Sequence, residues 1–281
     1  MKVLITGANG QVGWELKNQA NLNNFDLYAL DRKSLDITNK KMIEKQVIKL
    51  HPDIIVNAAA YTSVDMAEKE DLLAYQVNSG GPEKLAVICN KLSIFLIHIS
   101  TDYVFNGCKK GSYNEDDITD PLNIYGMTKL KGEEAIRRIL DRHLILRTSW
   151  VFGSHGKNFV KTIINLAKQK NDLCVIEDQH GCPTSAKSVA QVIFNICDKY
   201  RLEKEIKFGT YHYTNTPTTT WYLFAKKILQ VAYEENLIKN EVKISQIASK
   251  DYFSGSRKPK NSTLSSKKIH QDFGIVSKPW I

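Results

Sequence analysis

The opening of the chain, residues 1–13, constrains its fold more than any other stretch. Residues 2–6 form a short run of apolar and β-branched side chains, which is typical of a buried parallel strand. Gly7, Gly10 and Gly13 follow, and a helical pattern continues from Trp14. This spacing lets the backbone turn tightly, lets a pyrophosphate approach the amide groups of the helix, and lets that helix pack closely on the sheet. Because strand, loop and helix occur in this order, the sequence predicts a dinucleotide-binding unit and not a plain glycine-rich turn.

Strand and helix patterns alternate along the first half of the chain. Strands are expected at 26–30, 53–57, 94–99 and 143–147, and helices at about 39–50, at about 74–92 and from Tyr125 onward. This rhythm predicts an α/β protein with a Rossmann-like doubly wound parallel sheet. Four small or polar residues fall at the carboxyl ends of expected strands: Gly7, Asn57, Thr101 and Thr148. Since such sheets bind ligands outside the carboxyl ends of their strands, these residues are expected to converge on one site.

The alternation weakens beyond residue 150. Helices are expected at 159–170 and 221–234, short strands at 173–176 and 210–213, and a turn-rich polar loop at 178–184. We therefore expect residues 1–150 to form a dinucleotide-binding Rossmann domain. Residues 151–281 are expected to form a smaller mixed α/β substrate-binding lobe, interleaved with the first domain.

Two signals concern the dinucleotide itself. Asp31 ends the second expected strand, about 20 residues after the glycine loop, where an acid typically binds the adenosine ribose hydroxyls. Arg32 and Lys33 follow at once and could instead meet a 2′-phosphate. The sequence is thus compatible with both NADH and NADPH. Small residues at 57–60, next to Tyr61, indicate a second place where the backbone approaches the cofactor closely.

Tyr125 and Lys129 lie four residues apart at the start of a helical pattern, so both side chains project from one face. A tyrosine with an unperturbed pKa of about 10 is a weak acid at neutral pH. A lysine ammonium beside it favours the phenolate and is expected to lower the pKa of the tyrosine. The pair therefore suits proton donation to an oxygen while a hydride reaches the attached carbon.

Composition and cysteine usage indicate the cellular compartment of the protein. The hydrophobic content of 42% is ordinary for a globular protein, and no apolar run approaches the roughly 20 residues of a membrane helix. The first residues are typical of a strand and not of a signal peptide. The five cysteines form no Cys-x-x-Cys pair, which favours reduced thiols. We expect a cytoplasmic protein without a membrane partner.

The net charge of +9 allows several interpretations. Basic residues gather near the C-terminus: Arg257, Lys258, Lys260, Lys267, Lys268 and Lys278. A nucleic-acid tail is one reading, but Phe253, Leu264 and Trp280 in the same segment indicate packing instead of a disordered basic arm. An anionic substrate such as a nucleoside diphosphate is a sufficient partner, so no nucleic acid is expected. A merely solvated basic face is the plain alternative.

The motifs together resemble those of the extended short-chain dehydrogenase/reductase superfamily and, more closely, of the dTDP-4-dehydrorhamnose reductase family. The glycine loop and the Tyr125–Lys129 pair are common to the superfamily. More specific stretches lie at 35–38, 57–62, 100–105, 147–152 and 178–184, and they extend over most of the chain. The resemblance implies NAD(P)H-dependent reduction of the C4 keto group of dTDP-4-dehydro-6-deoxy-L-mannose to dTDP-L-rhamnose, the final step of dTDP-rhamnose biosynthesis.

The resemblance also implies residue roles. The catalytic residues would be Tyr125, Lys129 and Thr101. The cofactor-binding residues would be Gly7, Asn9, Gly10, Gln11, Val12, Gly13, Asp31, Arg32, Asp36, Ile37, Ala58, Ala59, Ala60, Tyr61, Tyr125 and Lys129. The substrate-binding residues would be Thr101, Asp102, Tyr103, Val104, Phe105, Tyr125 and Trp150. In this scheme Tyr125 donates the proton to the C4 oxygen, and Thr101 hydrogen-bonds that oxygen.

Two departures from the family pattern stand out. Lys258 replaces an arginine that precedes a proline, and lysine cannot bind a phosphate through two parallel hydrogen bonds as arginine does. Some family members bind Mg²⁺ through glutamates at a dimer contact. Glu15 matches one of these positions, but Lys187 stands where another acid is expected. A Mg²⁺ role is therefore not assumed, no residue is assigned to a metal, and a homodimer is expected from the resemblance alone.

Two other functions are compatible with the same fold. One is another nucleotide-sugar enzyme of the extended superfamily, an epimerase or a dehydratase. Dehydratases of this superfamily carry an Asp-Glu pair after the catalytic threonine, whereas here Tyr103 follows Asp102, which argues against elimination. The other is a non-catalytic, cofactor-sensing regulatory subunit. The presence of Thr101, Tyr125 and Lys129 argues against that alternative.

Overall fold

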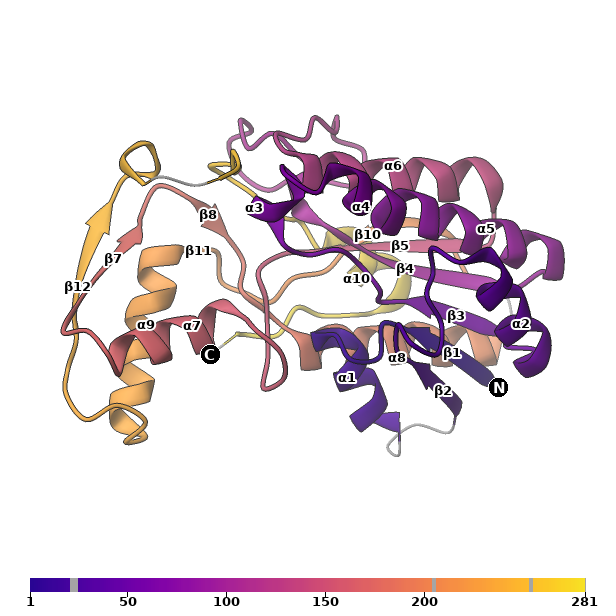
Figure 1. The fold of residues 1–281 in the computed structure, drawn as a ribbon, viewed down its shortest axis with the longest axis horizontal. Helices are drawn as coiled ribbons and strands as arrows, with labels where there is room; N and C mark the ends of the chain where they lie inside the picture. The colour runs from indigo at the N-terminus through magenta and orange to yellow at the C-terminus, as the bar shows by residue number, and fades with distance from the viewer. Residues whose placement is uncertain (21–24, 204–205, 253–254, 281) are drawn as a thin grey trace.

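The computed structural model describes residues 1–281 apart from 21–24, 204–205, 253–254 and 281. Its centre is a parallel sheet of six strands in the order β10-β5-β4-β3-β1-β2 (Figure 1). The strands are β1 (Lys2–Thr6), β2 (Asp26–Leu30), β3 (Ile54–Asn57), β4 (Phe95–Thr101), β5 (His143–Thr148) and β10 (Gly209–His212). Neighbouring strands all pair in parallel. The expected doubly wound parallel sheet is therefore confirmed.

Helices cover both faces of the sheet. On one face lie α1 (Gln11–Asn18) and α8 (Ala186–Glu203), and on the other lie α2 (Lys40–Leu50), α5 (Gly81–Leu92) and α6 (Ile124–Ile139). The strands alternate between the two cores: Val3 and Ile5 pack with the first pair of helices, and Leu4 packs with the second set. Burial on both faces explains why the strand sequences are almost continuously apolar.

The order of the strands in the sheet reverses direction at β1. β1 has β2 on one side and β3 on the other, so the connections leave β1 in opposite directions. A doubly wound sheet opens a crevice at such a switch point, outside the carboxyl ends of its strands. Gly7 and Ala58, which follow β1 and β3, lie at this crevice.

The helix expected at about 74–92 is present, but it begins a few residues earlier and contains a π turn. The structure has α3 (Val64–Ala67), α4 (Asp71–Tyr75), a π-helical turn over Gln76–Gly80 and then α5. The Asn78 side chain accepts a hydrogen bond from the Tyr61 amide at 2.8 Å and donates to the Tyr61 carbonyl oxygen at 3.0 Å. Through the π turn, the Asn78 side chain faces the loop after β3. Its two hydrogen bonds to Tyr61 hold that loop beside the glycine loop.

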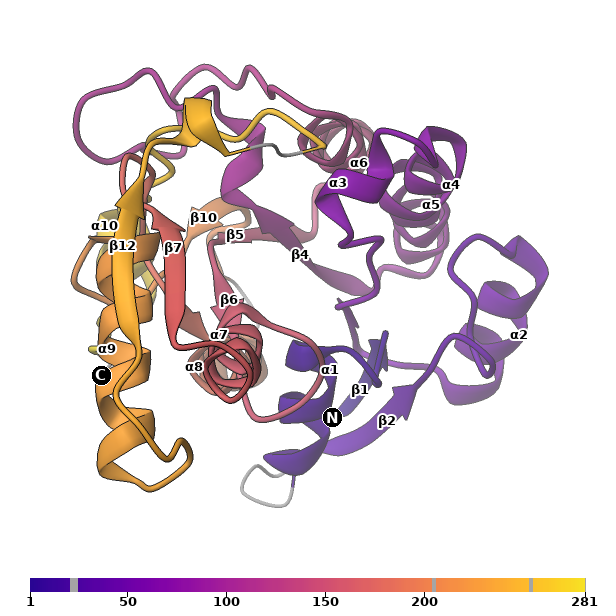
Figure 2. The same cartoon turned by 60° about the vertical axis from the view of Figure 1, so that its left-hand side comes forward.

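The second half of the chain does not form a lobe alone. Its α8 packs against α1, and β10 extends the main sheet next to β5. The rest builds a smaller body from α7 (Phe159–Ala167), α9 (Trp221–Glu234) and the parallel pair β7 (Asp172–Ile176) and β12 (Lys243–Ile247). Figure 2 brings this body forward and shows β7 and β12 side by side.

The smaller body has a core of its own, and short elements join it to the sheet. Buried residues of α7, α9 and β7 pack together, with tryptophans at the edge of the cluster. The connections contain β6 (Val151–Phe152) paired with β9 (Thr184–Ser185), and β8 (His180–Gly181) paired with β11 (Thr219–Thr220). Two 3₁₀ turns, Asp102–Val104 and Ser249–Asp251, and α10 (Lys267–Phe273) complete the regular elements of the described residues.

Candidate active site

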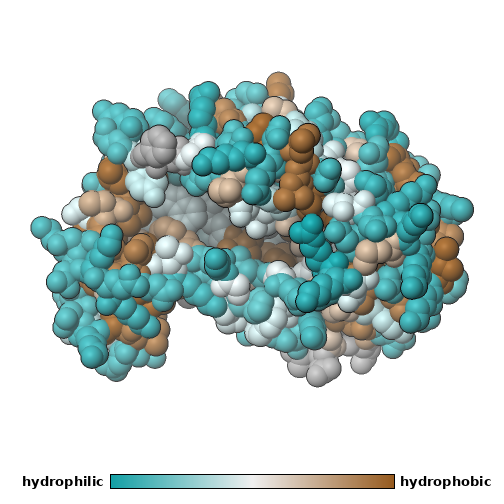
Figure 3. Space-filling view, in the orientation of Figure 1, coloured by the Kyte–Doolittle hydropathy of each residue, from teal (hydrophilic) through white to brown (hydrophobic). Residues whose placement is uncertain are grey.

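A cavity of about 580 Å³ lies at the carboxyl ends of β1, β3, β4 and β5, where the smaller body meets the sheet. The space-filling view shows this part of the surface hollowed (Figure 3). The cavity is lined by Asn9, Gly10, Gln11, Val12, Ala58, Ala60, Thr62, Ser63, Ile99, Ser100, Thr101, Asp102, Tyr125, Lys129, Thr148, Trp150, Val151, Gly156, Lys157 and Asn158. Residues far apart in the sequence therefore meet at one site.

The glycine loop has the backbone geometry of a phosphate cradle. Gly7 has φ of +68°, and a Cβ at this position would lie 2.6 Å from the backbone of Ala59. A Cβ on Gly13 would lie 2.2 Å from the Gly7 carbonyl oxygen. Only glycine fits either position without displacing the backbone. The first turn of α1 carries no acidic residue, so its amide groups face the cavity without a competing carboxylate.

A second hollow of about 230 Å³ adjoins the first. The two share Asn9, Gly10, Ala58 and Ala60. The second hollow is also lined by Gly7, Arg32, Leu35, Asp36, Ile37, Ala59, Tyr61, Leu73 and Val77. Asp31 lies beside it, accepting hydrogen bonds from the Ser34 amide at 2.9 Å and from the Asn9 side chain at 3.3 Å. Hydrogen bonds from Ser34 hold the pKa of Asp31 below its ordinary value.

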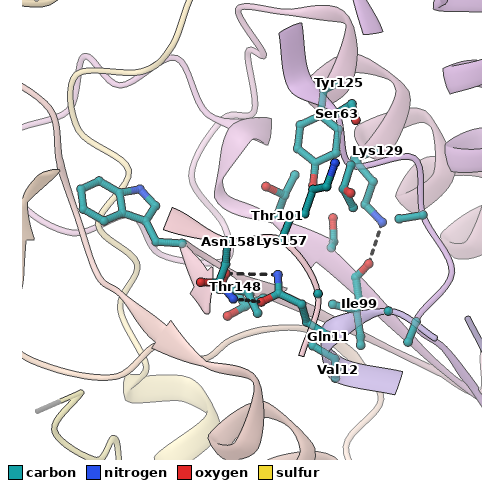
Figure 4. A pocket seen from close by; sticks show the side chains of 18 of the residues that line it. Gln11, Val12, Ser63, Ile99, Thr101, Tyr125, Lys129, Thr148, Lys157 and Asn158 are labelled. Carbon is teal, nitrogen blue, oxygen red and sulfur yellow. Dashed lines mark hydrogen bonds between the residues drawn. The ribbon is translucent and has the colours of Figure 1, made fainter. Parts of the chain in front are cut away.

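The side chains of Tyr125 and Lys129 project from the start of α6 into the same cavity (Figure 4). The helix begins there because the Asn123 side chain accepts a hydrogen bond from the Gly126 amide at 2.8 Å. Lys129 Nζ donates to the Ile99 carbonyl oxygen at 2.6 Å. A Cβ on Gly126 would lie 2.1 Å from the Tyr103 carbonyl oxygen, so the first turn of α6 lies directly against the end of β4.

The expected lowering of the Tyr125 pKa is wrong for this structure. Burial raises the pKa of Tyr125 to about 12, and a hydrogen bond with Thr101 opposes that rise only in part. Burial also lowers the pKa of Lys129, to about 8. The cost of removing charge from water exceeds the attraction that the sequence spacing suggested. The phenol is therefore fully protonated at neutral pH, which is the state that a proton donor requires.

Thr101 and Asp102 close the cavity at the end of β4. The Thr101 hydroxyl donates to Asp102 Oδ1 at 3.0 Å and accepts from the Tyr103 amide at 3.2 Å. Asp102 is 2% exposed, and burial raises its pKa to about 7. The Tyr103 ring packs edge-on against the Tyr125 ring, with 5.8 Å between centroids. Tyr103 thus limits where the phenol can move.

Val104 and Phe105 lie behind the cavity wall. Both are fully buried in a small cluster with Tyr113, Leu130 and Leu264, and neither is among the lining residues. Trp150 does line the cavity. Its ring stacks on the Trp221 ring at 3.5 Å between centroids, and Gly181 lies against its other edge. The backbone of Trp150 has φ of +46°, a conformation that such bulky residues adopt rarely and that is often found at functional sites.

The site contains residues that the sequence patterns did not indicate. Asn158 Nδ2 donates to Gln11 Oε1 at 3.1 Å and to the Gly153 carbonyl oxygen at 2.7 Å. Lys157 lines the same wall beside Thr148, which was expected at the site, and Ser63 lies on the opposite side. The loop before α7 therefore reaches over the glycine loop. Asn158 is also the N-cap of α7, so its position before an apolar run was the one signal available.

A buried ion pair fixes α6 against the sheet. Arg147 of β5 donates to Glu133 of α6 through Nε at 2.9 Å and through Nη2 at 2.6 Å. Ser100 of β4 also donates to Glu133. Burial alone would raise the pKa of Glu133, but Arg147 and the hydrogen bonds hold it at about 2. The carboxylate therefore stays charged, and it ties the helix that carries Tyr125 and Lys129 to two strands.

Neither a metal centre nor a membrane helix is found in the described part of the chain. Glu15 accepts a hydrogen bond from the Gln19 side chain at 3.3 Å, and Gln19 also donates to the Lys187 carbonyl oxygen at 3.3 Å. No group of three or more His, Cys, Asp or Glu residues is placed to bind a metal ion among the residues described. Within the same residues, no helix is both long and apolar enough to cross a membrane.

A parallel sheet with a glycine cradle at its switch point, and a Tyr–Lys pair beside it, defines the class of extended short-chain dehydrogenase/reductases. The comparisons with known proteins narrow the class. The family model described as RmlD substrate binding domain matches residues 1–281. A dTDP-4-dehydrorhamnose reductase from Aggregatibacter actinomycetemcomitans is 42% identical over 280 residues, which are 99% of this chain and 95% of that protein.

Solved structures agree with this result. A dTDP-4-dehydrorhamnose reductase from Clostridium acetobutylicum superimposes with a TM-score of 0.92 at 35% identity, covering 100% of this chain and 95% of the other. One from Bacillus anthracis, solved in complex with NADP, gives 0.90 at 36% identity, covering 99% and 94%. The chain belongs to the dTDP-4-dehydrorhamnose reductase family, as the resemblance in sequence indicated.

Proposed function

We propose that this protein reduces the C4 keto group of dTDP-4-dehydro-6-deoxy-L-mannose with NADPH or NADH and releases dTDP-L-rhamnose, in the last step of dTDP-rhamnose synthesis. One observation carries the proposal: Tyr125, Lys129 and Thr101 line the cavity that the glycine loop also lines. A proton donor and a dinucleotide cradle in one cavity are what carbonyl reduction needs. The family membership of the chain supports the particular substrate.

The residues present fit a dinucleotide. The cradle of Gly7, Gly10 and Gly13 leaves the space that any Cβ would fill, next to the N-terminus of α1. The proposed binding set is completed by Asn9, Gln11, Val12, Asp31, Arg32, Asp36, Ile37, Ala58, Ala59, Ala60, Tyr61, Tyr125 and Lys129. When bound, the reduced nicotinamide supplies the hydride. Asp31 and Arg32 lie together, so either a ribose hydroxyl or a 2′-phosphate has a partner; NADP in the Bacillus anthracis relative supports the second.

The residues of the chain provide the proton and the orientation. Tyr125 holds its proton at neutral pH and donates it to the C4 oxygen of the substrate. Thr101, which lines the cavity together with Tyr125, orients that oxygen. Lys129 places a positive charge at the base of the cavity below its pKa of about 8. A positioned proton donor of this kind accelerates a reaction by about 10²–10⁴-fold.

The substrate side of the cavity draws on residues from both halves of the chain. In this proposal residues 1–150 bind the dinucleotide and residues 151–281 form the interleaved lobe for the nucleotide sugar. Asp102, Tyr103 and Trp150 form the sugar pocket, with Val104 and Phe105 supporting it from behind. A further hollow of about 880 Å³ is lined by Arg257, Lys258 and Lys260, and their charges suit a diphosphate. The basic C-terminal segment then serves a nucleotide sugar, with no role for nucleic acid or membrane.

Cellular place and assembly follow from the same proposal. A reductase that consumes a nucleotide sugar and a reduced dinucleotide works where both are made, which is the cytoplasm. A homodimer is proposed from the family resemblance. No metal contribution is proposed, because Lys187 stands where a second acid is expected. Sedimentation with and without a chelator would separate a metal-free dimer from a metal-dependent one and from a monomer.

The proposal is tested with the keto-sugar made by an upstream dehydratase and epimerase, while reduced-dinucleotide absorbance is followed. Wild-type protein is expected to consume reduced dinucleotide one-for-one with dTDP-L-rhamnose formed. Tyr125→Phe lacks the phenol proton and is expected to lose about 10²–10⁴-fold in kcat while still binding NADPH. Tyr233→Phe, an exposed tyrosine on α9, is the matched control and should leave kcat unchanged.

Three outcomes would contradict the proposal. A Tyr125→Phe variant with undiminished kcat would remove the proton donor. A changed sugar without net consumption of reduced dinucleotide, seen by NMR of the product, would indicate an epimerase or a dehydratase. No turnover, together with stable association of this chain with another enzyme, would indicate the regulatory subunit.

A further inference from the structure

A chain of buried side chains runs from Lys129 away from the cavity. Lys129 Nζ lies 3.3 Å from His98 Nε2, and His98 Nδ1 lies 3.0 Å from Asn57 Nδ2. Asn57 Oδ1 accepts hydrogen bonds from the Ala59 amide at 3.3 Å and from the Thr6 hydroxyl at 2.7 Å. His98, Asn57 and Thr6 are each at most 1% exposed, so water does not supply partners for them.

The orientation of Asn57 decides which nitrogen of His98 carries the proton. The Ala59 amide can only donate, so Asn57 must present its oxygen to that amide and its NH₂ group to His98. Because Asn57 Nδ2 donates, His98 Nδ1 must accept, and the ring proton then lies on Nε2. The Nε2–H group points at Lys129 Nζ.

Counting donors shows that this network has one proton too many for a charged lysine. Between the Ala59 amide and Lys129 there are three contacts, while Asn57 and neutral His98 offer one acceptor each. If Lys129 is an ammonium, one contact must pair two donors, whichever way Asn57 or the imidazole is arranged. If Lys129 is a neutral amine, its lone pair accepts from His98 Nε2 and all three contacts are satisfied. The amine still donates to the Ile99 carbonyl oxygen.

We propose that Asn57 and His98 are positioning residues for Lys129: they hold the imidazole with its proton on Nε2 and thereby favour the neutral amine over the ammonium. The charge of Lys129 then titrates within the working pH range of the protein. Asn57 ends β3 and His98 lies in β4, so the tuning is built into the sheet and not into a mobile loop. An unpaired donor in a buried network is costly enough to shift this equilibrium.

The surrounding charges agree with this assignment. Burial lowers the pKa of Lys129 to about 8, against the attraction of Glu133, which favours the ammonium. Burial lowers the pKa of His98 well below its ordinary value, and Lys129 lowers it further whenever the lysine is charged, so the imidazole is neutral in both states of the lysine. Tyr125, Asp102 and Lys157 line the same cavity as Lys129, and Arg147 of β5 is paired with Glu133.

The first test uses the unmodified full-length protein and needs no activity. Long-range ¹⁵N–¹H NMR spectra of the histidine rings distinguish the two tautomers, and we expect the His98 proton on Nε2. A titration of ¹³C-labelled lysine side chains is expected to show Lys129 losing its charge about two units below ordinary lysine, near pH 8. A proton on Nδ1 of His98, or a Lys129 that titrates with the exposed lysines, would overturn the proposal.

The second test reverses the network. In Asn57→Asp both carboxylate oxygens accept, so one keeps the Ala59 amide while the other takes a proton from His98 Nδ1. His98 Nε2 then becomes an acceptor for the ammonium, and the Lys129 titration should move up by about one unit or more. Thr6→Val is the matched control: it removes the hydroxyl bonded to Asn57 but leaves the Ala59 amide to orient the amide group, so Lys129 should titrate as in the wild type. A Lys129 titration unmoved by Asn57→Asp would also overturn the proposal.

The consequence for catalysis rests on the proposed function. If reduction needs the charge of Lys129, kcat/KM falls as pH rises through about 8, and in Asn57→Asp that alkaline limb moves to higher pH with the lysine titration. Suppose that Asn57→Asp shifts the Lys129 titration but leaves the alkaline limb of kcat/KM in place. The effect of Asn57 and His98 on the Lys129 pKa would then stand, and only the role of Lys129 in the reaction would be contradicted. The two failures are therefore distinguishable.

Discussion

At the scale of single residues, the sequence indicated which side chains meet but not their protonation. Tyr125, Lys129 and Thr101 line one cavity with the glycine loop, as their places at strand and helix ends predicted. The pKa direction of Tyr125 was wrong, because four-residue spacing says nothing about burial, and burial raises that pKa. His98 had no motif of its own. Its importance depends on the orientation of Asn57, which is set by a backbone amide two residues further along the chain.

The glycine loop gives a prediction at the scale of residues, in which Gly7 is the tested position and Gly111 is the control. Gly7 and Gly111 both have positive φ, at +68° and +83°, so alanine costs about 1–2 kcal/mol of backbone strain at either position. Only Gly7 approaches other backbone: a Cβ there would lie 2.6 Å from Ala59, whereas nothing lies within 4 Å at Gly111. Gly7→Ala is therefore expected to lose roughly 1–3 kcal/mol more in the free energy of unfolding, and to weaken NADPH binding.

Thermal unfolding and a fluorescence titration with NADPH measure both effects. Gly111→Ala should bind NADPH as the wild type does, because the loop around Gly111 is remote from both hollows of the site. If Gly7→Ala and Gly111→Ala lost the same free energy of unfolding, backbone strain alone would explain the glycine at position 7. The close approach to Ala59 would then contribute nothing.

At the scale of elements, local patterns succeeded where an element forms from its own sequence. β1, β2 and α9 have the bounds expected from apolar runs and from periodicity. The helix expected at about 74–92 is continuous in the structure, but it widens into a π turn where Asn78 bonds to Tyr61, a contact that spans 17 residues. The returning strand β10 was expected only as a short strand. Its place beside β5 depends on long-range pairing that a local pattern does not contain.

The ion pair that anchors α6 provides a prediction at this scale. Arg147→Met leaves the buried Glu133 with Arg137, at 3.0 Å, as its remaining ion-pair partner among the described residues. Removing one member of a buried pair typically costs about 3–5 kcal/mol in the free energy of unfolding. The double variant Arg147→Met/Glu133→Gln removes the stranded charge and is expected to recover part of that loss. Denaturant unfolding curves of the wild type, Arg147→Met and the double variant measure both the loss of free energy of unfolding and its partial recovery.

The acid dependence of stability follows from the same pair. The pKa of Glu133 is about 2 in the folded state, below its ordinary value of 4.5. A depressed carboxyl pKa stabilises the fold above the ordinary value, and this contribution is lost as pH falls from about 4.5 toward 2. Arg147→Met raises the pKa of Glu133, so the variant should lose less stability than the wild type over that interval. A double variant no more stable than Arg147→Met would contradict the stranded-charge explanation.

At the scale of the whole molecule, the site exists only where two bodies meet. Three hydrogen bonds join the loop of residues 153–158 and β6 to the glycine loop region: Asn158 to Gln11, Gln11 to the Val151 carbonyl, and His155 to the Asn9 carbonyl. The His155 ring also stacks on the Trp14 ring, with 5.1 Å between centroids. None of these contacts could be predicted from the sequence, since each joins residues more than 130 positions apart.

The last prediction concerns this junction. Asn158→Ser keeps a good N-cap for α7, but serine is too short to donate to Gln11 as asparagine does at 3.1 Å. A lost hydrogen bond of about 0.5–1.5 kcal/mol corresponds to roughly a 2- to 13-fold change in affinity. We therefore expect the KM for NADPH to rise several-fold with kcat nearly unchanged, because Gln11 belongs to the proposed dinucleotide-binding set and not to the proposed proton donor. Asn195→Ser, at an exposed position of α8 that lines neither hollow of the site, is the matched control and should leave KM unchanged. If kcat fell while KM stayed constant, the junction would act on the chemistry around Tyr125 instead of on dinucleotide binding.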